Sequence, residues 1–413
     1  MRVGIAVGLP VALVLSLAGC SGGSPTPTPI GCRPGFSSPC PDNDPFYKAS
    51  AQELRTHPHG SVLKTRSPFI NDDTLRSLAR ATTVLYASTD IHDQPIAASE
   101  TVLTPKQPYA GPGRRPILSY QIPYDSLSTR CEPSYQLQHS SSQGALQIPL
   151  LDATVQLGWT VVVPDYEGPQ ALFAIGPQQG RTILDGIRAT EQLRQGGIDR
   201  TSRVMMWGYS GGALGSAWAS EMQPTYAADL NVIGVAEGGL PSNLKATIQA
   251  VDGGRYSYLG PLALAAMARA FPGAGITEAL NPDGKRAFDA IQDACSTDPA
   301  LLRLAHHSLR DFTTQPGLLN QPKVDAALQQ LNLGRAAPQV PIYNYQGVLD
   351  QIVPFTTNQA LVRFYCSQGV VVDHVVSDNA DHVAAGVAGV QPALQWLTSR
   401  VAGTPSPNTC HHG

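Results

Sequence analysis

Near the middle of this chain, a serine lies between glycines where an apolar run meets a helical segment. Residues 204–207 are Val-Met-Met-Trp, which is typical of a short buried strand, and Gly208-Tyr-Ser210-Gly-Gly212 follows directly. Residues 213–222 then have a helical composition. A strand that passes into a helix through so sharp a turn holds the serine in strained backbone and lifts its hydroxyl clear of a sheet. The pattern predicts that Ser210 is a nucleophile; the alternative is a glycine-rich turn that happens to contain a serine.

The partners that such a serine needs are expected further along the chain. A serine hydroxyl is a weak nucleophile until a base takes its proton, and in α/β-hydrolases the order is serine, acid, histidine. Asp350 comes just after a strand-like segment at 340–346, and His382 follows a second such segment at 370–376, in a loop before the last helix. Order and placement predict that Asp350 orients His382 and that His382 is the base.

Other ionisable residues have plainer interpretations. Asp381 adjoins His382, but neighbours on a loop usually point apart, and Asp378 and Asp373 stay open as alternative acids. His374 alternates with apolar residues and is expected to be packed in a strand. The remaining candidates are expected to be structural or superficial: Asp185 with Arg188 as an (i, i+3) pair, Asp165 and Glu167 as residues that hold loops or, less favoured, contact substrate, and His306 with His307 on the surface.

Apolar segments that alternate with helical ones predict an α/β fold of the hydrolase type, with a mostly parallel central sheet and helices on both faces. The expected strands are 82–89, 96–104, 116–122, 157–164, 204–207, 232–237, 340–346 and 370–376, and the expected helices include 177–195, 213–222 and one from Gly386.

A long insertion interrupts this alternation. About a hundred residues separate the sixth and seventh of these strands, too many for a crossover connection. We therefore expect a cap over residues 241–337, in which 261–271 and 299–309 have helical patterns. An insertion at this edge of the sheet would cover Ser210 as a lid. A structural subdomain without a gating role is the equally open alternative.

The N-terminus has the pattern of an export signal. Arg2 precedes an apolar stretch from Gly4 to Leu17 that is short for a membrane span. Leu17-Ala-Gly-Cys20 is similar to a bacterial lipobox, in which the cysteine becomes the lipidated first residue; an ordinary signal peptide is the alternative. We expect a lipoprotein signal peptide at 1–20, a Ser-, Pro- and Thr-rich tether at 21–43 and a catalytic domain at 44–413, in an exported protein that is anchored to the membrane through Cys20 or secreted.

Cysteine usage agrees with export. Setting Cys20 aside, six of the seven cysteines remain, an even number for which many pairings are possible. Our hypothesis pairs Cys32 with Cys40, Cys131 with Cys295, and Cys366 with Cys410. The second pair would tie a loop at the sheet edge to the insertion, and the third would tie the C-terminus to the last pair of helices.

Composition narrows the function further. The 413 residues are 42% hydrophobic, ample for a large core, and carry a formal net charge of −3. That charge, without a cluster of Lys or Arg, argues against a nucleic-acid binder. No Cys-x-x-Cys or histidine-rich cluster resembles a metal site, and the expected chemistry needs neither a metal nor an organic cofactor.

Several segments together resemble the secretory lipase family, whose best known fold type is that of yeast lipase A. They are Gly208-Tyr-Ser-Gly-Gly212, Pro164-Asp-Tyr-Glu-Gly-Pro169, Leu184-Asp-Gly-Ile-Arg-Ala189, Asp350-Gln-Ile-Val-Pro354, Asp381-His382, and Ser119-Tyr-Gln121 followed by Asp125 and Cys131. The glycine-flanked serine alone indicates an α/β-hydrolase, and the segment from Pro164 to Pro169 makes the resemblance more specific. The resemblance spans roughly residues 44–402. It implies a cap-covered α/β-hydrolase that cleaves esters, including acylglycerols.

The resemblance also implies roles for individual residues. Ser210 would be the nucleophile, Asp350 the acid and His382 the base. In this family an aspartate after the third strand and the residue after the serine form the oxyanion hole, and by position these match Asp125 and Gly211. An ionised carboxylate aimed at an oxyanion is unfavourable, so the expected donor is the backbone N–H of Asp125 or its neutral side chain.

The sequence thus predicts a serine lipase or carboxylesterase that hydrolyses acylglycerols or other carboxylic esters through an acyl-enzyme on Ser210. Its expected partner is a lipid or small-molecule ester. A peptidase or amidase, and an acyltransferase acting on cell-envelope lipids, would use the same three residues. A further alternative, from a different class, is a surface binding protein with an inactive hydrolase fold.

Overall fold

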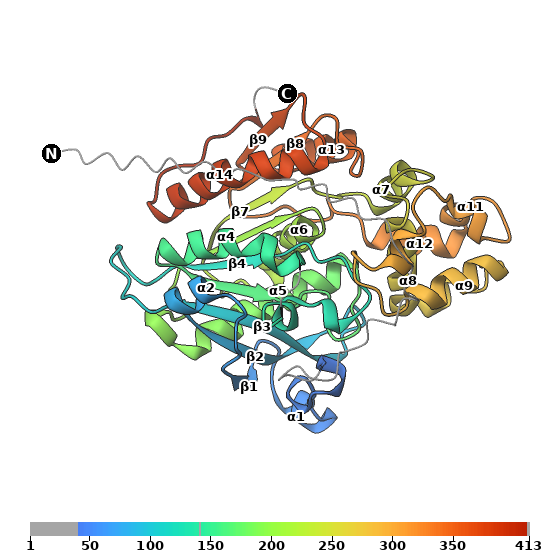
Figure 1. The fold of residues 1–413 in the computed structure, drawn as a ribbon. Coiled ribbons are helices and arrows are strands. Elements are labelled where there is room, and N and C mark those ends of the chain that lie inside the picture. The colour runs from blue at the N-terminus through green and yellow to red at the C-terminus, as the bar shows by residue number, and fades with distance from the viewer. Residues whose placement is uncertain (1–39, 140–141, 411–413) are drawn as a thin grey trace, which may run out of the picture. The chain divides into compact units, whose positions relative to one another are not determined.

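A single sheet runs through the part of the chain that the computed structural model describes, residues 40–139 and 142–410 (Figure 1). Its nine strands lie in the order β1-β2-β3-β5-β4-β6-β7-β8-β9. Their bounds are β1 Val62–Arg66, β2 Ala79–Thr89, β3 Pro95–Pro105, β4 Ile117–Gln121, β5 Thr160–Pro164, β6 Val204–Tyr209, β7 Val232–Gly238, β8 Ile342–Gly347 and β9 Val372–Ser377.

Two kinds of pairing divide this sheet. β1 pairs with β2, β2 with β3 and β3 with β5 in antiparallel fashion, whereas every pair from β5 through β4 to β9 is parallel. Because the carboxyl ends of parallel strands meet at one edge of a sheet, the loops after β4, β6, β8 and β9 are brought together there. The predicted α/β-hydrolase fold with a mostly parallel sheet is confirmed.

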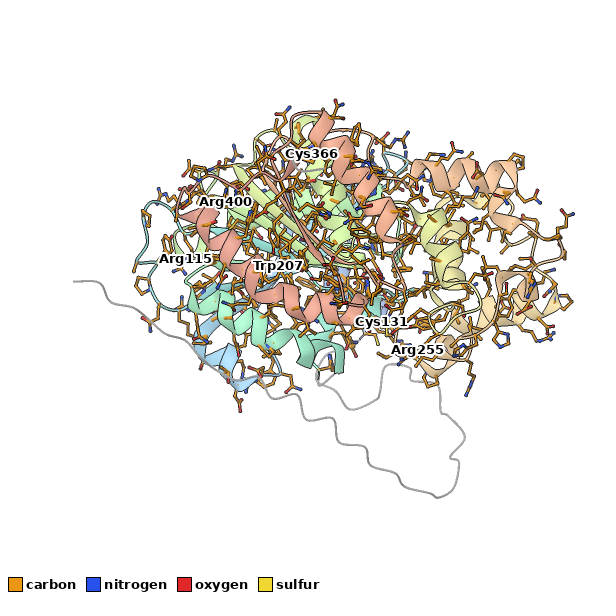
Figure 2. All side chains as sticks on the ribbon, turned by 90° about the horizontal axis from the view of Figure 1, so that it is seen from above. Arg115, Cys131, Trp207, Arg255, Cys366 and Arg400 are labelled. Atoms are coloured by element: carbon orange, nitrogen blue, oxygen red, sulfur yellow. A yellow bond between two sulfur atoms is a disulfide. The ribbon has the colours of Figure 1, made fainter. Side chains whose placement is uncertain are left out.

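Helices cover both faces of the sheet. α4 (Ser142–Gln156) and α14 (His382–Val401) pack over one face, and α5 (Gly176–Leu193), α6 (Gly211–Tyr226) and α13 (Phe355–Ser367) pack over the other. Side chains of β6 contribute to the hydrophobic core on both faces of the sheet. Met206 packs with α5 and α6 on one face, and Trp207 packs with α14 on the other (Figure 2). This alternation follows from the period of two along a strand and explains why residues 204–207 are apolar throughout.

The insertion forms a cap of short helices beyond one end of the sheet, on the right in Figure 1. Its helices are α7 Leu244–Val251, α8 Leu259–Ala270, α9 Pro282–Ile291, α10 Pro299–Leu302, α11 Leu309–Phe312 and α12 Pro322–Gln330. The helix expected at 261–271 corresponds to α8. The helix expected at 299–309 is wrong: α10 ends after four residues, because His306 takes a left-handed backbone (φ 66°) and Ser308 starts a new capped helix.

The remaining elements are short. They are α1 Ala51–Thr56, α2 Asp73–Leu78, α3 Pro133–Gln136 and the 3-10 helices Pro41–Asn43, Pro45–Tyr47, Thr129–Cys131, Gln195–Gly197, Pro272–Ala274 and Leu318–Asn320. Within the described residues, β1 was not anticipated from the sequence, and the strand expected from 157 begins only at Thr160, since Gly158 makes a turn with φ 83°.

Two disulfides join distant parts of the chain. Cys131 is bonded to Cys295, with Cα atoms 5.5 Å apart, and Cys366 is bonded to Cys410, at 5.4 Å. These two predicted pairs are confirmed; Figure 2 shows Cys131 and Cys366 in separate parts of the molecule. The proposed partner of Cys40, Cys32, lies outside the described residues, as do the predicted signal peptide, Cys20 and the tail at 411–413.

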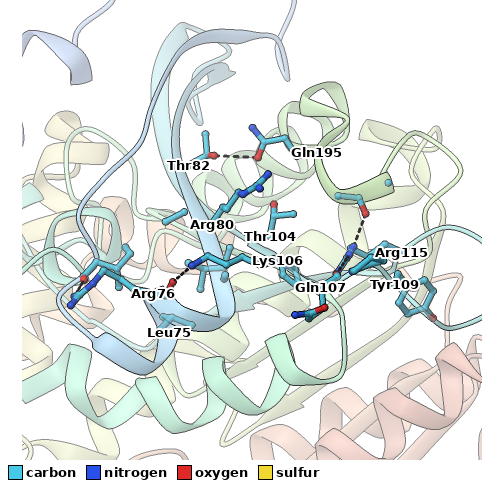
Figure 3. A pocket seen from close by; sticks show the side chains of 18 of the residues that line it. Leu75, Arg76, Arg80, Thr82, Thr104, Lys106, Gln107, Tyr109, Arg115 and Gln195 are labelled. Carbon is cyan, nitrogen blue, oxygen red and sulfur yellow. Dashed lines mark hydrogen bonds between the residues drawn. The ribbon is translucent and has the colours of Figure 1, made fainter.

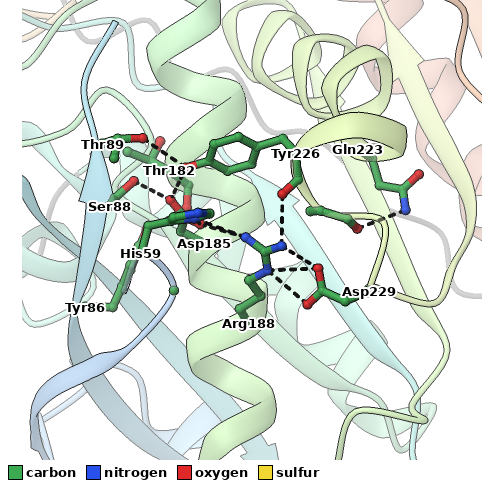
Figure 4. Close-up of polar contacts among 12 residues, drawn as sticks. His59, Tyr86, Ser88, Thr89, Thr182, Asp185, Arg188, Gln223, Tyr226 and Asp229 are labelled. Atoms are coloured by element: carbon green, nitrogen blue, oxygen red, sulfur yellow. Dashed lines mark hydrogen bonds and ion pairs between the residues drawn. The ribbon is translucent and has the colours of Figure 1, made fainter. Parts of the chain in front are cut away.

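A polar cluster around Asp185 ties α5 to its neighbours (Figure 4). The buried Asp185 carboxylate accepts hydrogen bonds from Ser88 of β2 and Tyr226 of α6, at 2.8 and 2.7 Å, and lies 2.7 Å from His59 Nδ1. Arg188 reaches Asp185 at 3.4 Å, which confirms the predicted (i, i+3) pair, and also binds Asp229. None of the residues predicted to be catalytic takes part in these contacts.

Candidate active site

Ser210 occupies a strained turn between β6 and α6. Its backbone dihedral angles are φ 55° and ψ −123°, a region that residues other than glycine rarely adopt. The flanking glycines are sterically required, because a Cβ at Gly208 would overlap the carbonyl of Gly212, and a Cβ at Gly212 would overlap the carbonyl of Gln121. Ser210 N–H donates to the Gly238 carbonyl of β7 at 2.9 Å, which fixes the turn to the sheet. Its backbone is that of a nucleophile elbow.

The structure brings Ser210, His382 and Asp350 together from three separate elements. Ser210 Oγ is hydrogen-bonded to His382 Nε2 at 2.9 Å, and His382 Nδ1 to Asp350 Oδ2 at 2.7 Å. The Asp350 side chain is fully buried and His382 is 6% exposed. This is the geometry in which an imidazole can remove a serine proton while a carboxylate holds its tautomer.

Backbone and side-chain contacts fix the acid and the histidine. The other Asp350 oxygen accepts N–H donors from Ile352 and Val353, at 2.9 and 2.7 Å, so the turn after β8 holds the carboxylate. His382 N–H donates to the Gln351 side chain at 3.1 Å, and the Tyr209 hydroxyl donates to the His382 carbonyl. The sequence does not predict a role for Tyr209 or Gln351, although each adjoins a predicted site residue.

The rival acids lie elsewhere. Asp381 is exposed and caps α14 by accepting from Ala384 N at 2.8 Å. Asp378 is exposed, and Asp373 is half-buried, with its pKa raised by burial and lowered by Arg400. Because Asp381 caps the helix, α14 begins at His382 and not near Gly386; the expectation that His382 lies in a loop is wrong.

Other ionisable residues take the structural places expected of them. His374 is half-buried, with Nδ1 hydrogen-bonded to Asn344 at 3.0 Å and its ring stacked on Phe355. His306 and His307 are exposed. Asp165 accepts from Ser134 N at 2.8 Å, and Glu167 accepts from the Ser126 hydroxyl at 3.1 Å, so both hold the loop after β4. Burial raises the pKa of Asp165 to about 6.

Asp125 and Gly211 meet beside Ser210. Asp125 has a positive φ of 40°, and its Oδ1 approaches Gly211 so closely that a Cβ there would overlap it. Burial raises the pKa of this carboxyl to about 6, with His382 acting in the opposite direction. Among the described residues, Asp125 Oδ1 has no hydrogen-bond partner. The arrangement leaves Gly211 N–H, at the start of α6, and the Asp125 carboxyl beside the serine hydroxyl.

The cap closes over this group. A cavity of about 40 Å³ lies above Ser210, Gly211 and Asp125. The cap helices α7 and α8 line it with Leu244, Thr247, Ile248, Val251, Leu259 and Ala263, and the rest of its wall is Phe173, Ala174, Leu214, Pro241, Ile352 and Val353. The predicted position of the insertion over Ser210 is confirmed. Twelve of the fifteen lining residues are apolar. The other three are Ser210, Thr247 and Asp125, and Asp125 is the one lining residue with an ionisable side chain.

A second and larger cavity, of about 980 Å³, lies at another part of the molecule (Figure 3). Its wall comes from the ends of β2 and β3 and from Gln195–Gly197, and includes Arg76, Arg80 and Lys106. Arg115 donates to the carbonyls of Gln107, Gly158 and Gly196, at 2.6 to 2.7 Å, so this buried guanidinium fastens loops together. None of the predicted site residues lines this cavity.

Two further observations apply to the described residues alone. No three His, Cys, Asp or Glu side chains gather there as metal ligands. Nor does any helix in residues 40–139 and 142–410 combine the length and apolar character that crossing a membrane requires.

Comparison with known proteins agrees with the fold. The profile of the Secretory lipase family matches residues 135–409. Lipase 5 of Candida albicans is 31% identical over 396 residues, 90% of this chain and 83% of the relative. A protein of Mycobacterium tuberculosis named as a probable inactive lipase is 32% identical over 377 residues, 88% of this chain and 83% of the relative.

A solved structure extends the likeness to three dimensions. Candida antarctica lipase A in its closed state superposes with a TM-score of 0.84 at 27% identity, covering 90% of this chain and 89% of that chain. The fold and the glycine-flanked serine thus define an α/β-hydrolase. The chain belongs to the Secretory lipase family, and this family together with the two disulfides points to an extracellular or secreted protein.

Proposed function

We propose that this protein is a serine hydrolase that cleaves carboxylic esters of lipids, with Ser210 as nucleophile, His382 as general base and Asp350 as the acid that orients it. The observation that carries the proposal is the 2.9 Å contact between Ser210 Oγ and His382 Nε2 at a strained elbow. Strain of this kind is retained where the backbone must present one side chain to a substrate.

The first half of the reaction forms an acyl-enzyme. His382 Nε2 accepts the Ser210 proton as Oγ bonds to the ester carbonyl carbon, and Asp350 stabilises the resulting imidazolium through Nδ1–H. The carbonyl oxygen becomes an oxyanion that faces Gly211 N–H and the Asp125 carboxyl. When the tetrahedral adduct collapses, the ester C–O bond breaks and His382 gives its proton to the leaving alcohol.

The second half releases the acid. Water attacks the acyl carbon and gives a proton to His382, a second tetrahedral adduct forms, and its collapse breaks the bond to Ser210 Oγ. The proton on His382 returns to Oγ and a carboxylic acid leaves. Both halves use the same oxyanion donors, so one arrangement of residues serves both.

The apolar lining of the cavity supports the proposal that the substrate carries an apolar acyl group. Leu214, Ile248, Val251, Leu259 and Val353 surround the space next to Ser210. Such a wall contributes about 0.8 kcal/mol for each buried CH₂ of an acyl chain. A peptide with charged side chains would leave charges unpaired against this wall, which favours lipid esters over the peptidase alternative.

Hydrolysis of p-nitrophenyl esters from acetyl to palmitoyl tests this function. We expect activity that extends to long acyl chains in the Cys20→Ser protein and that is lost in the same protein with Ser210→Ala. Activity confined to short chains would identify a carboxylesterase with a small acyl site. Cleavage of p-nitroanilides in preference to the esters would overturn the proposal in favour of an amidase, and acyl transfer to an added alcohol in preference to water would identify an acyltransferase.

An inactive protein is a second candidate, because one relative is named a probable inactive lipase. The complete hydrogen-bonded set of Ser210, His382 and Asp350 in this chain favours activity. Labelling with a fluorophosphonate probe decides between them: we expect Ser210 to be labelled in the folded protein. Absence of labelling, with Ser210→Ala as reference, would support the inactive alternative.

We further propose that a lipid on Cys20 anchors the mature protein to the membrane, on the strength of Leu17-Ala-Gly-Cys20. The Pro- and Thr-rich segment after it would act as a tether. Metabolic labelling with a fatty acid tests this. We expect label in the wild type and none in Cys20→Ser, whereas equal labelling of both would contradict it.

A further inference from the structure

The outward side of α14 is apolar over its first two turns. Val383 is 57% exposed, Val387 is 71% exposed, and Val390 is also exposed. Their spacing of four and three residues places them on one side of the helix, opposite Gly389, which packs against Tyr345 of β8. From Val383 to Ser399 the helix contains no Asp, Glu, Lys, Arg or His. A solvent-facing helix surface normally carries charged residues, so this one requires an explanation.

Two further exposed apolar residues lie beside the start of α14. Val348 and Leu349 follow β8, and Leu349 is 58% exposed. Their backbone N–H groups donate to the carbonyls of Ser377 and Ala380, at 2.9 and 3.2 Å. These bonds hold the loop against the segment that leads into the helix. We call the five residues Val348, Leu349, Val383, Val387 and Val390 the apolar face.

The apolar face is continuous with the proposed catalytic residues. Leu349 directly precedes Asp350, and Val383 directly follows His382. The two pairs are held together, since Asp350 binds the His382 ring and Gln351 accepts from His382 N–H. A flat apolar surface pressed against the apolar face would therefore lie next to the two residues that activate Ser210.

The charged residues near the apolar face indicate which kind of lipid surface it can bind. Residues 364–399 contain no Lys or Arg, and the exposed charged residues of this stretch are Asp378 and Asp381. Binding to anionic lipid relies on Lys and Arg next to the membrane. The apolar face lacks such cations and instead has carboxylates that would be repelled by an anionic surface, so an uncharged lipid surface is the better match.

We infer that the apolar face is the surface by which this protein rests on an uncharged lipid layer, such as an acylglycerol droplet, while Ser210 acts on esters within it. This inference rests on the proposed function for its substrate, but binding to the layer does not require turnover. Transfer of the exposed valine side chains from water into lipid lowers the free energy, as it does for amphipathic helices that lie in a membrane interface.

Flotation of the protein with triolein droplets tests the inference without catalysis. The full chain carries Cys20→Ser, so that no lipid anchor contributes, and Ser210→Ala, so that the droplets are not consumed. Val387→Asp is the test variant, since its exposed side chain makes folding insensitive to the change. Leu157→Asp is the matched control: Leu157 is also exposed, but it precedes β5, at the amino ends of the parallel strands, whereas α14 begins beyond their carboxyl ends.

We expect the parent and Leu157→Asp to float with the droplets, and Val387→Asp to bind at least about tenfold more weakly. With Ser210 restored, Val387→Asp should lose activity on triolein droplets by a similar factor and keep its activity on dissolved p-nitrophenyl acetate. Equal binding by Val387→Asp, or equal loss by Leu157→Asp, would overturn the inference. Preference for phosphatidylglycerol vesicles over the droplets would overturn the uncharged surface.

The experiment separates this inference from the proposed function. A protein that floats through Val387 but hydrolyses no ester would retain the apolar face and refute the esterase. A protein that hydrolyses p-nitrophenyl acetate but does not float would do the reverse. A parent that is dimeric in size-exclusion chromatography and becomes monomeric with Val387→Asp would assign the apolar face to a second copy of the chain, against the inference.

Discussion

Asp350 and Asp381 are both close to His382 along the chain or in space, but their contacts differ. Asp350 is buried and binds the imidazole, whereas Asp381 binds the backbone of α14. We expect Asp350→Asn to lower kcat by about 10⁴, because the amide stabilises the wrong imidazole tautomer. Asp381→Asn should stay within about twofold of wild type, since asparagine caps a helix as well as aspartate. Steady-state kinetics on one ester compares them, and full activity of Asp350→Asn would refute the assignment of the acid.

Asp125 offers a second test at the scale of one residue. Its neutral carboxyl can donate to an oxyanion, and burial raises its pKa to about 6. We expect Asp125→Ala to lower kcat by about 10²–10³, as for loss of one oxyanion donor. Asp125→Asn keeps a donor at every pH, so the ratio of wild-type to Asp125→Asn activity should fall as pH rises through about 6. If the ratio of wild-type to Asp125→Asn activity does not depend on pH, and Asp125→Ala is as active as wild type, the Asp125 side chain does not donate to the oxyanion. The donor at this position would then be the backbone N–H of residue 125.

The residues that sequence reasoning missed act through backbone groups. Tyr209 binds the His382 carbonyl and Gln351 binds its N–H. Neither residue type at these positions signals such a contact, because it depends on where α14 starts. By contrast, Ser210, Asp350 and His382 could be predicted because each follows within five residues of a strand, so that a short-range pattern places it at the same edge of the sheet.

Among the elements, the Cys131–Cys295 disulfide joins the cap to the loop that carries Asp125. Next to it, Leu127 N–H donates to the Ala294 carbonyl at 2.9 Å, and Arg269 of α8 donates to the Leu127 carbonyl at 2.9 Å. The disulfide closes a loop with a sequence separation of 164 residues, so its removal should release much chain entropy in the unfolded state. Removal of this disulfide should also make the position of Asp125 relative to Gly211 less fixed.

We therefore expect the double variant Cys131→Ala/Cys295→Ala to lose about 2–5 kcal/mol of stability and, in addition, to lose activity. The matched control is Cys366→Ala/Cys410→Ala, which removes a disulfide at the other end of the sheet, with a separation of 44 residues. It should lower stability with little change in kcat. Urea unfolding and ester hydrolysis measure the two effects. Equal kcat values for both double variants would show that the first disulfide does not position the oxyanion donors.

Elements with a strong local signal were predictable, and those defined by distant contacts were less so. β6 and α6 follow from an apolar run, two glycines and a helical segment. The segment at 299–309 is apolar enough for a helix, but its chain turns at His306, where it contacts the loop between α7 and α8: His306 N–H donates to the Gly254 carbonyl at 2.8 Å. Tertiary contacts of this kind override helical propensity.

At the scale of the whole molecule, alternating strands and helices indicated the parallel sheet, because each crossover needs a helix between two buried strands. The antiparallel strands β1, β2 and β3 add an edge whose order could not be read from the sequence, since pairing between distant strands leaves no local pattern. The buried carboxyls Glu100, Glu132 and Glu237 were likewise missed, because in sequence they look like any acidic residue on a surface.

Buried carboxyls, including Glu237, Glu191 and Asp165, make the stability of the whole fold depend on pH. Burial raises the pKa of Glu237 to about 8, that of Glu191 to about 7 and that of Asp165 to about 6. In the unfolded chain such groups titrate near pH 4. Between about pH 4 and 8 the folded state therefore keeps protons that the unfolded state has released, and the free energy of unfolding falls as pH rises. Asp229, whose pKa Arg188 lowers, acts in the opposite direction only below about pH 4.

We expect the Tm to be several degrees higher at about pH 5 than at about pH 8.5. Glu237→Gln should reduce this difference, because it removes a carboxyl whose pKa burial raises to about 8, inside this pH range, while Asn344 can still bind the amide oxygen. Asp325→Asn is the control, since its pKa is lowered by Lys245 and its titration lies below this range. Scanning calorimetry of the three proteins at both pH values measures the effect. A Tm that rises from pH 5 to 8.5, or a Glu237→Gln protein with the wild-type dependence, would show that Glu237 ionises in the folded protein without the cost its burial implies.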